Sequence, residues 1–168
     1  MTAESADTSV ETRVLSGDDW GTWRDIRLRS LQDSPSAFAS TYEREAAFTE
    51  ADWRERLENP ESVSVLAYDG GVPVAMGAAF PDVPGYLQVV AMWSAPASRG
   101  RGGARAVLAV IERHARDVGR RLHLNVNAAN LTARGVFERY GFESTGETQP
   151  MREGSDDLME RMVLPERG

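Results

Sequence analysis

The sequence predicts an α/β (α+β) domain with a mixed, mostly antiparallel central sheet of about six to seven strands and about four helices. Apolar residues alternate from Val63 to Ala78 on either side of a turn at Asp69–Gly71, which is typical of an antiparallel hairpin. An apolar run over 86–95 then leads through a glycine-rich stretch into a helical pattern over 104–118, followed by another alternating segment. This order indicates two parallel strands joined by a helix, so the sheet is predicted to be mixed.

The length of 168 residues favours one domain with one core. The first nine residues are small and polar, and we expect them to form a flexible N-terminal arm (1–9) before a single domain over 10–168. No repeat, low-complexity tract or linker divides the chain.

Before the hairpin, the pattern predicts a short strand over 10–15 and two helices. The first helix has Ser16 or Asp18 as its N-cap and ends before Pro35. The second runs from a Thr49 cap to Pro60. The apolar anchors of the two helices are Trp23, Ile26, Leu28, Leu31, Trp53 and Leu57.

After the hairpin, the strand over 86–95 is apolar at almost every position, as expected for a central strand that is covered on both faces. The next helix ends at Gly119 and leads through a right-handed crossover to a strand over 121–127. A short helix between an Asn130 cap and Gly141 follows, and two closing strands are expected, one after Phe142 and one over Leu158–Leu164.

Composition excludes several classes of function. The chain has no cysteine and therefore no thiolate nucleophile. Because it also has only two histidines, a zinc enzyme is not expected, and we expect no metal. The net charge of −7 argues against general binding to nucleic acid. No membrane-spanning or signal segment is evident, and we expect a cytoplasmic protein without a membrane or nucleic acid partner.

The stretch "SRGRGGARAVL" places Gly100, Gly102 and Gly103 directly before a helix. A strand, a glycine loop and a helix N-terminus together form a cradle for anions, although a tight turn alone explains a single glycine. A Walker loop requires lysine, which the chain lacks, and a dinucleotide fingerprint requires a small residue where Arg105 stands.

The segment "PASRGRGGARAVL", with R-x-x-G-x-A spacing, resembles the pyrophosphate-binding motif of the GNAT superfamily of acetyl-coenzyme A-dependent N-acetyltransferases. The segment "NVNAANLTARGVFERYGF" is similar to the family's N-x-x-N-x-x-A-x-x-x-Y-E-x-x-G-F segment. The resemblance implies a GNAT-like fold in which the two central parallel strands splay apart and acetyl-CoA, the co-substrate, lies in the gap.

The resemblance also implies a binding site. The pantetheine arm is expected along the free edge of the central strand and beside the short helix, and the pyrophosphate on the amides of residues 100–104, with Arg99 or Arg101 outside. Packing alone explains the strand residues equally well, and capping alone explains Asn130. The residues assigned to the coenzyme are Met92, Trp93, Ser94, Arg99, Gly100, Arg101, Gly102, Gly103, Ala104, Asn130 and Phe137.

The catalytic positions depart from the family's pattern. The usual thiolate acid, a tyrosine four residues before the helix-ending glycine, is Phe137 here, and the usual base position holds Gln88. Tyr140 lies close to the same helix face as Phe137 and is a weak candidate for the missing acid, the alternative being a packed aromatic. His123 is expected to be structural. As alternative bases, Glu43, Glu45 and Glu50 are expected to be solvated charges.

These observations favour an N-acetyltransferase that moves an acetyl group directly from acetyl-CoA to a primary amine, either a small molecule or a peptide α-amine. The acidic charge balance mildly favours a cationic acceptor. The alternatives are a catalytically silent coenzyme A-binding sensor or partner-binding module and a transferase of longer acyl groups. The family also makes a homodimer possible. Trp20, Trp23 and Trp53 either pack in the core or line an acceptor pocket.

Overall fold

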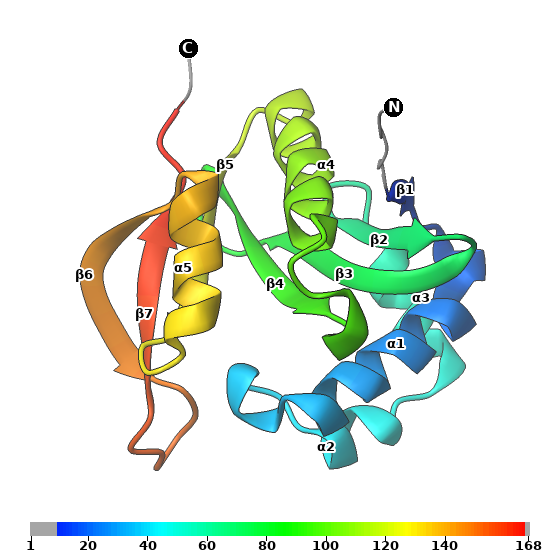
Figure 1. The fold of residues 1–168 in the computed structure, drawn as a ribbon, viewed down its shortest axis with the longest axis horizontal. Helices are drawn as coiled ribbons and strands as arrows, with labels where there is room; N and C mark the ends of the chain where they lie inside the picture. Colours follow the sequence, from blue (N-terminus) through cyan, green and yellow to red (C-terminus); the bar gives the residue numbers. More distant parts are fainter. Residues whose placement is uncertain (1–9, 167–168) are drawn as a thin grey trace, which may run out of the picture.

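The computed structural model describes residues 10–166 and contains a seven-stranded sheet in the order β1-β2-β3-β4-β5-β7-β6 (Figure 1). The expected N-terminal arm falls on residues outside this described range. The strands are β1 (Glu11–Val14), β2 (Val63–Asp69), β3 (Val72–Pro81), β4 (Tyr86–Ser94), β5 (Arg121–Asn127), β6 (Glu143–Pro150) and β7 (Leu158–Val163). The helices are α1 (Trp20–Asp33), α2 (Tyr42–Ala46), α3 (Glu50–Glu58), α4 (Gly103–Asp117) and α5 (Leu131–Tyr140).

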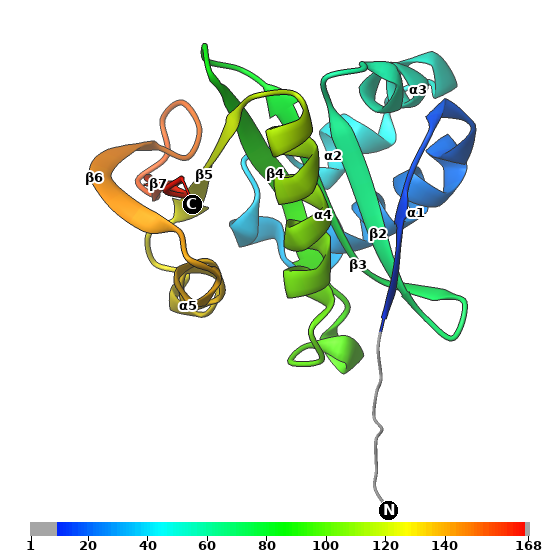
Figure 2. The same ribbon diagram turned by 90° about the horizontal axis from the view of Figure 1, so that it is seen from above.

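The helices form a layer on each face of the sheet. Seen from above, α4 and α5 lie on one face, and α1, α2 and α3 lie on the other (Figure 2). Two separate groups of buried side chains result, one under α4 and α5 and one under α1 and α3. Within the described residues, no helix is long and apolar enough to cross a membrane.

The fold class, the mixed sheet and the number of strands are confirmed. The structure has five α-helices rather than about four, because the sequence pattern did not reveal α2, which has only five residues. Its cap is Thr41, whose hydroxyl accepts a hydrogen bond from the backbone N–H of Arg44 at 3.2 Å. A helix of one turn is too short to show a 3.6-residue apolar period, so nothing in the hydrophobic pattern marked it.

The capping residues predicted for the first two long helices are both present, but one of them caps a different element. Ser16 caps a single 3₁₀ turn over Gly17–Asp19 rather than α1 itself, and its backbone N–H donates to the Asp19 carboxylate at 2.8 Å. Thr49 caps α3 as expected, in a reciprocal arrangement with Asp52. Both are capping boxes, which satisfy amide groups that a helix start leaves without acceptors.

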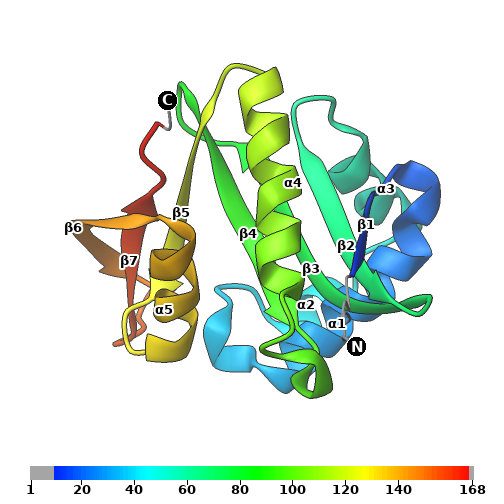
Figure 3. The ribbon, with the colours of Figure 1, turned by 45° about the horizontal axis from the view of Figure 1, so that its top comes forward.

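The parallel pairing of β4 and β5 is short. Only Tyr86–Val89 of β4 pairs with β5, in register with Arg121–Leu124. Beyond this point β5 continues beside β7, and the two central strands diverge toward the end of the sheet that holds the glycine loop (Figure 3). The last five residues of β4 therefore have β3 on one side and an open edge on the other, which is the splay that the resemblance implied.

The expected burial of β4 on both faces is correct only in part. Leu87 and Val89 are buried beneath α4, whereas Tyr86, Gln88 and Val90 on the opposite face are half-buried. The helices on that face cover β2 and β3 more than the start of β4, since α1 and α3 are displaced toward the β1 side of the sheet (Figure 3).

Gly77 of β3 gives a direct test of the packing between the sheet and α4. A Cβ atom at this position would lie 2.3 Å from Met92 Sδ and 2.7 Å from Val107 Cγ1. Gly77→Ala is therefore expected to lower the free energy of unfolding by roughly 1–3 kcal/mol, measured by urea denaturation. Gly21→Ala is the control because a Cβ there meets nothing within 4 Å. Equal stability changes in the two variants would contradict this packing.

Candidate functional site

The glycine loop between β4 and α4 uses its three glycines in two ways. Gly100 and Gly102 have φ of 82° and 88°, in the left-handed region that side chains disfavour. Gly103 has another role, since a Cβ there would lie 2.9 Å from Ala75 Cβ on β3. Two glycines thus turn the backbone and the third lets α4 begin close to the sheet.

The backbone N–H groups of residues 100–105 donate to no acceptor among residues 10–166. Gly102, the N-cap of α4, has no side chain that could accept from them. Unpaired amides at a helix N-terminus, together with the positive end of the helix dipole, favour an anion. The loop has the donors that a diphosphate requires.

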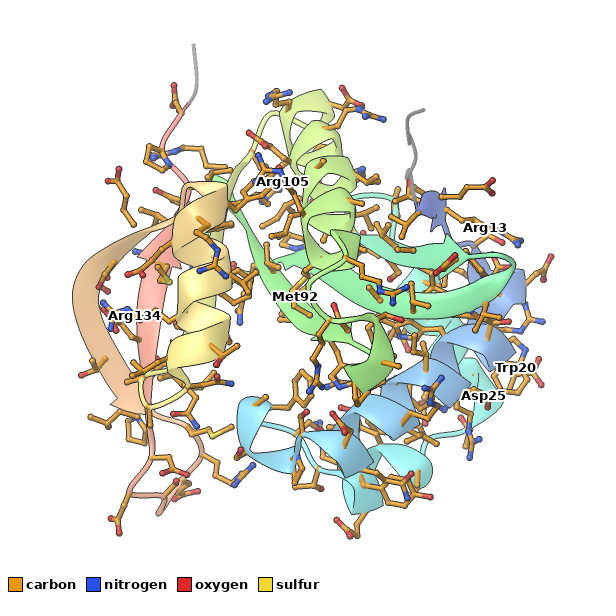
Figure 4. The ribbon with its side chains drawn as sticks, in the orientation of Figure 1. Arg13, Trp20, Asp25, Met92, Arg105 and Arg134 are labelled. Carbon is orange, nitrogen blue, oxygen red and sulfur yellow. The ribbon has the colours of Figure 1, made fainter. Side chains whose placement is uncertain are left out.

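The three arginines in and beside the glycine loop lie in different surroundings. Arg99 donates to Ser94 O at 3.0 Å and to Asp33 Oδ2 at 2.7 Å, so its guanidinium is engaged at the end of α1. Arg105 lies over the ring of Tyr140 at 5.4 Å, on the side of α4 that faces α5 (Figure 4). Arg101 is exposed and pairs with none of the described residues. Of the two arginines expected outside the pyrophosphate, Arg101 is the free one.

Asp33 is a functional candidate that the sequence did not reveal. Its carboxylate accepts from the Trp93 indole at 3.0 Å, from Arg99 at 2.7 Å and from Ser34 Oγ at 2.7 Å. These hydrogen bonds lower the pKa of Asp33 to about 2. Asp33 thus joins the end of α1 to the end of β4 and to the glycine loop. Its partners lie up to 66 positions away in sequence, beyond the reach of any local pattern.

A bulge interrupts β4 within its unpaired half. Met76 of β3 lies opposite Trp93 and Ala78 opposite Val90, so two residues of β4 face one residue of β3. Ala91, one of these two, has a φ of 60°, the single left-handed residue other than glycine within residues 10–166. Such an outlier is costly and concentrates at functional positions.

The open edge of β4 exposes backbone groups of alternate residues. The N–H of Ala95 donates to Val74 O of β3 at 2.8 Å, so by alternation the polar groups of Trp93 also face β3. Those of Met92 and Ser94 face the gap. The Trp93 side chain packs in the core under α1, whereas Met92 lies beside the gap (Figure 4).

The remaining predicted residues lie along α5 and at the start of the paired strands. Asn130 caps α5, with Oδ1 accepting from the Ala133 N–H at 3.1 Å. Phe137 is buried and packs edge-on against Phe142. The Tyr140 hydroxyl donates to Glu112 of α4 at 2.7 Å.

His123 is buried and has a partner at each ring nitrogen. Nδ1 accepts from Arg161 at 3.0 Å, and Nε2 lies 2.9 Å from the Asp82 carboxylate. Arginine only donates, so Nδ1 carries no proton in this arrangement and Nε2 is the donor. A structural role fits these contacts. Gln88, the residue in the usual base position, is the β4 neighbour of His123.

The alternative bases were predicted correctly only in part. Glu50 is exposed and paired with Arg54, and Glu43 is exposed. The expectation of a solvated charge is wrong for Glu45, which is 1 % exposed and accepts two hydrogen bonds from Arg27 at 2.9 and 3.0 Å. Burial raises the pKa of Glu45, but the hydrogen bonds and charge of Arg27 outweigh it, and the pKa is lowered.

The gap between β4 and β5 is bridged at its wide end. Asn127 at the end of β5 donates to Ser36 O at 2.9 Å, just after α1. Arg152, between β6 and β7, donates to Phe38 O at 3.0 Å. These two contacts join the segment after α1 to the far half of the sheet.

A groove of about 1110 Å³ lies on the other face of the sheet from α4. Its floor includes Ala78, Val90 and Ala91, and its walls come from α1 and from the segment that contains α2 and α3. The groove therefore reaches the bulge of β4 from the side opposite the glycine loop's helix. Trp23 lines it but is 4 % exposed, and Trp53 is fully buried, so these two tryptophans belong to the core.

Comparisons with known proteins agree with this geometry. A family model described as the acetyltransferase (GNAT) family matches residues 23–142, well over half of the chain. No curated protein matches the sequence.

Three solved structures are similar in fold. An acetyltransferase of the GNAT family from Streptococcus pneumoniae has a TM-score of 0.76 at 15% identity, over 93% of this chain and 100% of that one. A ribosomal-protein-alanine N-acetyltransferase from Brucella melitensis has a TM-score of 0.73 at 20% identity, over 91% and 98%. A putative acetyltransferase from Salmonella typhimurium with its cofactor acetyl-CoA has a TM-score of 0.71 at 16% identity, over 96% and 97%. At these identities the likeness shows the fold alone.

The lowered pKa of Asp33 predicts a pH-dependent contribution to stability. Because the folded state binds this proton more weakly than the unfolded chain, whose pKa is near 3.8, the contribution is complete above about pH 5 and disappears as the pH falls toward about 2. The urea midpoint of the wild type is expected to exceed that of Asp33→Asn at pH 7, and the difference is expected to shrink steadily as the pH falls from about 4 toward about 2.

The control is Asp25→Asn on the exposed side of α1, where the carboxylate side chain is 79% exposed (Figure 4). Its midpoint is expected to follow the wild type throughout. A difference between wild type and Asp33→Asn that stays constant or widens on acidification would contradict the role given to Asp33.

Proposed function

Because the chain belongs to the acetyltransferase (GNAT) family, we propose that it transfers an acetyl group from acetyl-CoA directly to a primary amine. The proposal rests on two features that lie at the same end of the sheet. One is the row of unpaired amides at residues 100–105, and the other is the open edge of β4 at Met92–Ser94. Together they match a ligand with an anionic diphosphate and an amide-containing arm.

The diphosphate of the coenzyme binds the amides at the start of α4, with Arg101 beside it. The pantetheine amides pair with the Ser94 N–H and the Met92 carbonyl, which face the gap, whereas Ser94 O accepts from Arg99. The carboxamide of Asn130 keeps its N–H₂ group for the ligand, since only its oxygen caps α5. Arg99 is a positioning residue in this account, because Asp33 holds its guanidinium away from the loop amides.

In the reaction, the amine nitrogen attacks the thioester carbon, a C–N bond forms and the C–S bond breaks. The proton lost by the amine passes to solvent, and the departing thiolate takes one. The Met92 N–H at the open edge donates to the carbonyl oxygen as charge develops there. Electrons and protons balance without a metal or a redox partner.

Because the usual acid and base are absent, the site favours an acceptor amine that is easily deprotonated near pH 7. Neutralising an amine of pKa near 10.4 at pH 7 costs about 4.6 kcal/mol, whereas an α-amine near pKa 8 costs about 1.4 kcal/mol. A coenzyme thiol with a pKa near 8.5 is protonated by water at modest cost. An α-amine therefore suits a site with Phe137 and Gln88 in those positions.

The first test is coenzyme binding. Gly102→Ala places a methyl group on the open side of the loop, where the diphosphate is proposed to bind, and the Kd for acetyl-CoA is expected to rise by about tenfold or more. Gly119→Ala is matched to it, because Gly119 also has a positive φ, 72°, and open space around its Cβ position.

Calorimetric titration measures both variants. Both lose similar stability from backbone strain, about 1 kcal/mol, and only Gly102→Ala is expected to lose affinity. Unchanged affinity in Gly102→Ala, or no binding of acetyl-CoA to the wild type, would remove the basis of the proposed function. Binding without thiol release on any amine would favour a coenzyme A sensor instead.

The second test concerns Tyr140. A phenol that protonates the thiolate contributes about 10²-fold or more to kcat. Since the Tyr140 hydroxyl is hydrogen-bonded to Glu112 and its ring packs under Arg105, we expect Tyr140→Phe to change kcat by less than about fivefold. Thiol release under saturating acetyl-CoA measures it. A fall of a hundredfold with unchanged acetyl-CoA affinity would make Tyr140 the acid.

A further inference from the structure

The groove that reaches Ala91 is lined by three arginines, two of which lie within 4 Å of the carboxylate of Glu45. Arg27 of α1, Arg44 of α2 and Arg56 of α3 all line it. Glu45 is the acid among them, bound by two nitrogens of Arg27 and 3.9 Å from Arg56. We call Arg27, Arg44, Arg56 and Glu45 the arginine cluster.

Arg27 has a donor that the protein itself does not satisfy. Its Nε and Nη2 are bound by Glu45, but Nη1 is buried and has no acceptor among residues 10–166. The residue is only 7 % exposed. A buried charged donor without a partner is costly, and natural proteins retain few of them. Its position in the groove lining points to an acceptor supplied from outside the chain.

The ring of Phe48 lies close to the guanidinium groups of both Arg44 and Arg56. Arg56 lies 4.4 Å from the ring centroid of Phe48, and Arg44 lies 5.6 Å from it. Burial lowers the pKa of Arg56, and the positive charges of Arg27 and Arg44 lower it further, against the opposing effect of Glu45. Within the arginine cluster, three guanidinium groups are therefore present with one carboxylate, that of Glu45.

Three further acids line the groove, and one of them, Asp52, is held by the cap of α3. Asp52 accepts from the Thr49 N–H at 2.9 Å, and Glu58 packs against Gly17. Glu55 and Glu58 are exposed, as are Arg44 and Arg56, so water and salt partly screen all four charges. None of these acids is hydrogen-bonded to Arg44 or Arg56.

We infer that the acceptor is an amine that also carries a carboxylate or phosphate group, which the arginine cluster binds. Guanidinium groups bind these planar or trigonal anions through paired hydrogen bonds. The anion binds Arg27 Nη1 together with Arg44 and Arg56, and the amine extends along the groove floor toward the bulge at Ala91. The inference rests on the proposed function, and it replaces the cationic acceptor that the acidic net charge favoured.

The activity test compares acceptors that differ in one charge. Thiol release is measured for glycine and alanine against their amides, and for phosphoethanolamine against ethanolamine. The anionic member of a pair is expected to have a kcat/KM about tenfold or more above its neutral partner. A preference in the first comparison identifies a carboxylate, and one in the second a phosphate. Equal rates, or faster reaction of the neutral compounds, would overturn the inference.

Variants locate the effect. Arg44→Gln and Arg56→Gln leave the buried Arg27–Glu45 pair intact, whereas changing Arg27 would strand Glu45 and threaten folding. Each is expected to lower kcat/KM for the anionic acceptor by about tenfold while changing the neutral acceptor and the KM for acetyl-CoA less than about twofold. Arg24→Gln, also on α1 but paired with exposed Asp25, is the control and is expected to match the wild type. An equal loss with both acceptors would indicate a structural role only.

A binding test separates this inference from the proposed function. Inorganic phosphate is added at constant ionic strength to protein saturated with coenzyme A, so that the glycine loop is occupied. The melting temperature is expected to rise for the wild type and Arg24→Gln, and to stay constant for the variant with both Arg44→Gln and Arg56→Gln. No rise in the wild type would overturn the arginine cluster as an anion site, whether or not acetyl transfer is found. A rise without turnover on any amine would keep the site and reject the transferase.

Discussion

The end of the parallel pairing at Val89 and Leu124 is the constraint on which the rest of the site depends. If β4 and β5 stayed paired, the backbone N–H and C=O groups of Met92 and Ser94 that face the gap would be hydrogen-bonded to β5. Divergence leaves them open, and the bulge at Ala91 turns the strand at the same place. Edge strands with free backbone groups are a hazard in most proteins, and the proposed coenzyme would pair with these groups.

Helix α1 links the two ends of the site from the opposite face of the sheet. At its end, the Asp33 carboxylate accepts hydrogen bonds from Trp93 and Arg99. On the preceding part of the helix, Arg27 forms the buried pair with Glu45. The first contact fixes the path of the chain from β4 into the glycine loop. The second leaves one buried guanidinium nitrogen of Arg27 without a hydrogen-bond acceptor beside the groove. One helix thereby contributes to both the proposed coenzyme site and the proposed acceptor site.

The sequence predicted the elements whose signals are local. Alternation gave the strands, and the cap at Thr49 and the glycines at 100–103 gave the ends of helices. The coenzyme residues stay a prediction, taken from the family resemblance of the glycine loop and of the segment that begins with Asn130. Asp33 and Glu45 were missed or misjudged because their roles come from contacts across 66 and 18 positions, and no local pattern distinguishes a buried, paired glutamate from a solvated one. The bulge at Ala91 was likewise invisible, since alanine has no preference for a left-handed backbone.

The most direct measurement is an NMR titration of the amide resonances of residues 100–104 with coenzyme A. The amide resonances of Gly102 and Gly103 are expected to shift strongly as the protein is saturated with coenzyme A. Their amide protons are expected to exchange more slowly with solvent in the complex. If coenzyme A binds while these amides stay unchanged and resonances elsewhere move, the diphosphate has another site and the proposed arrangement is wrong.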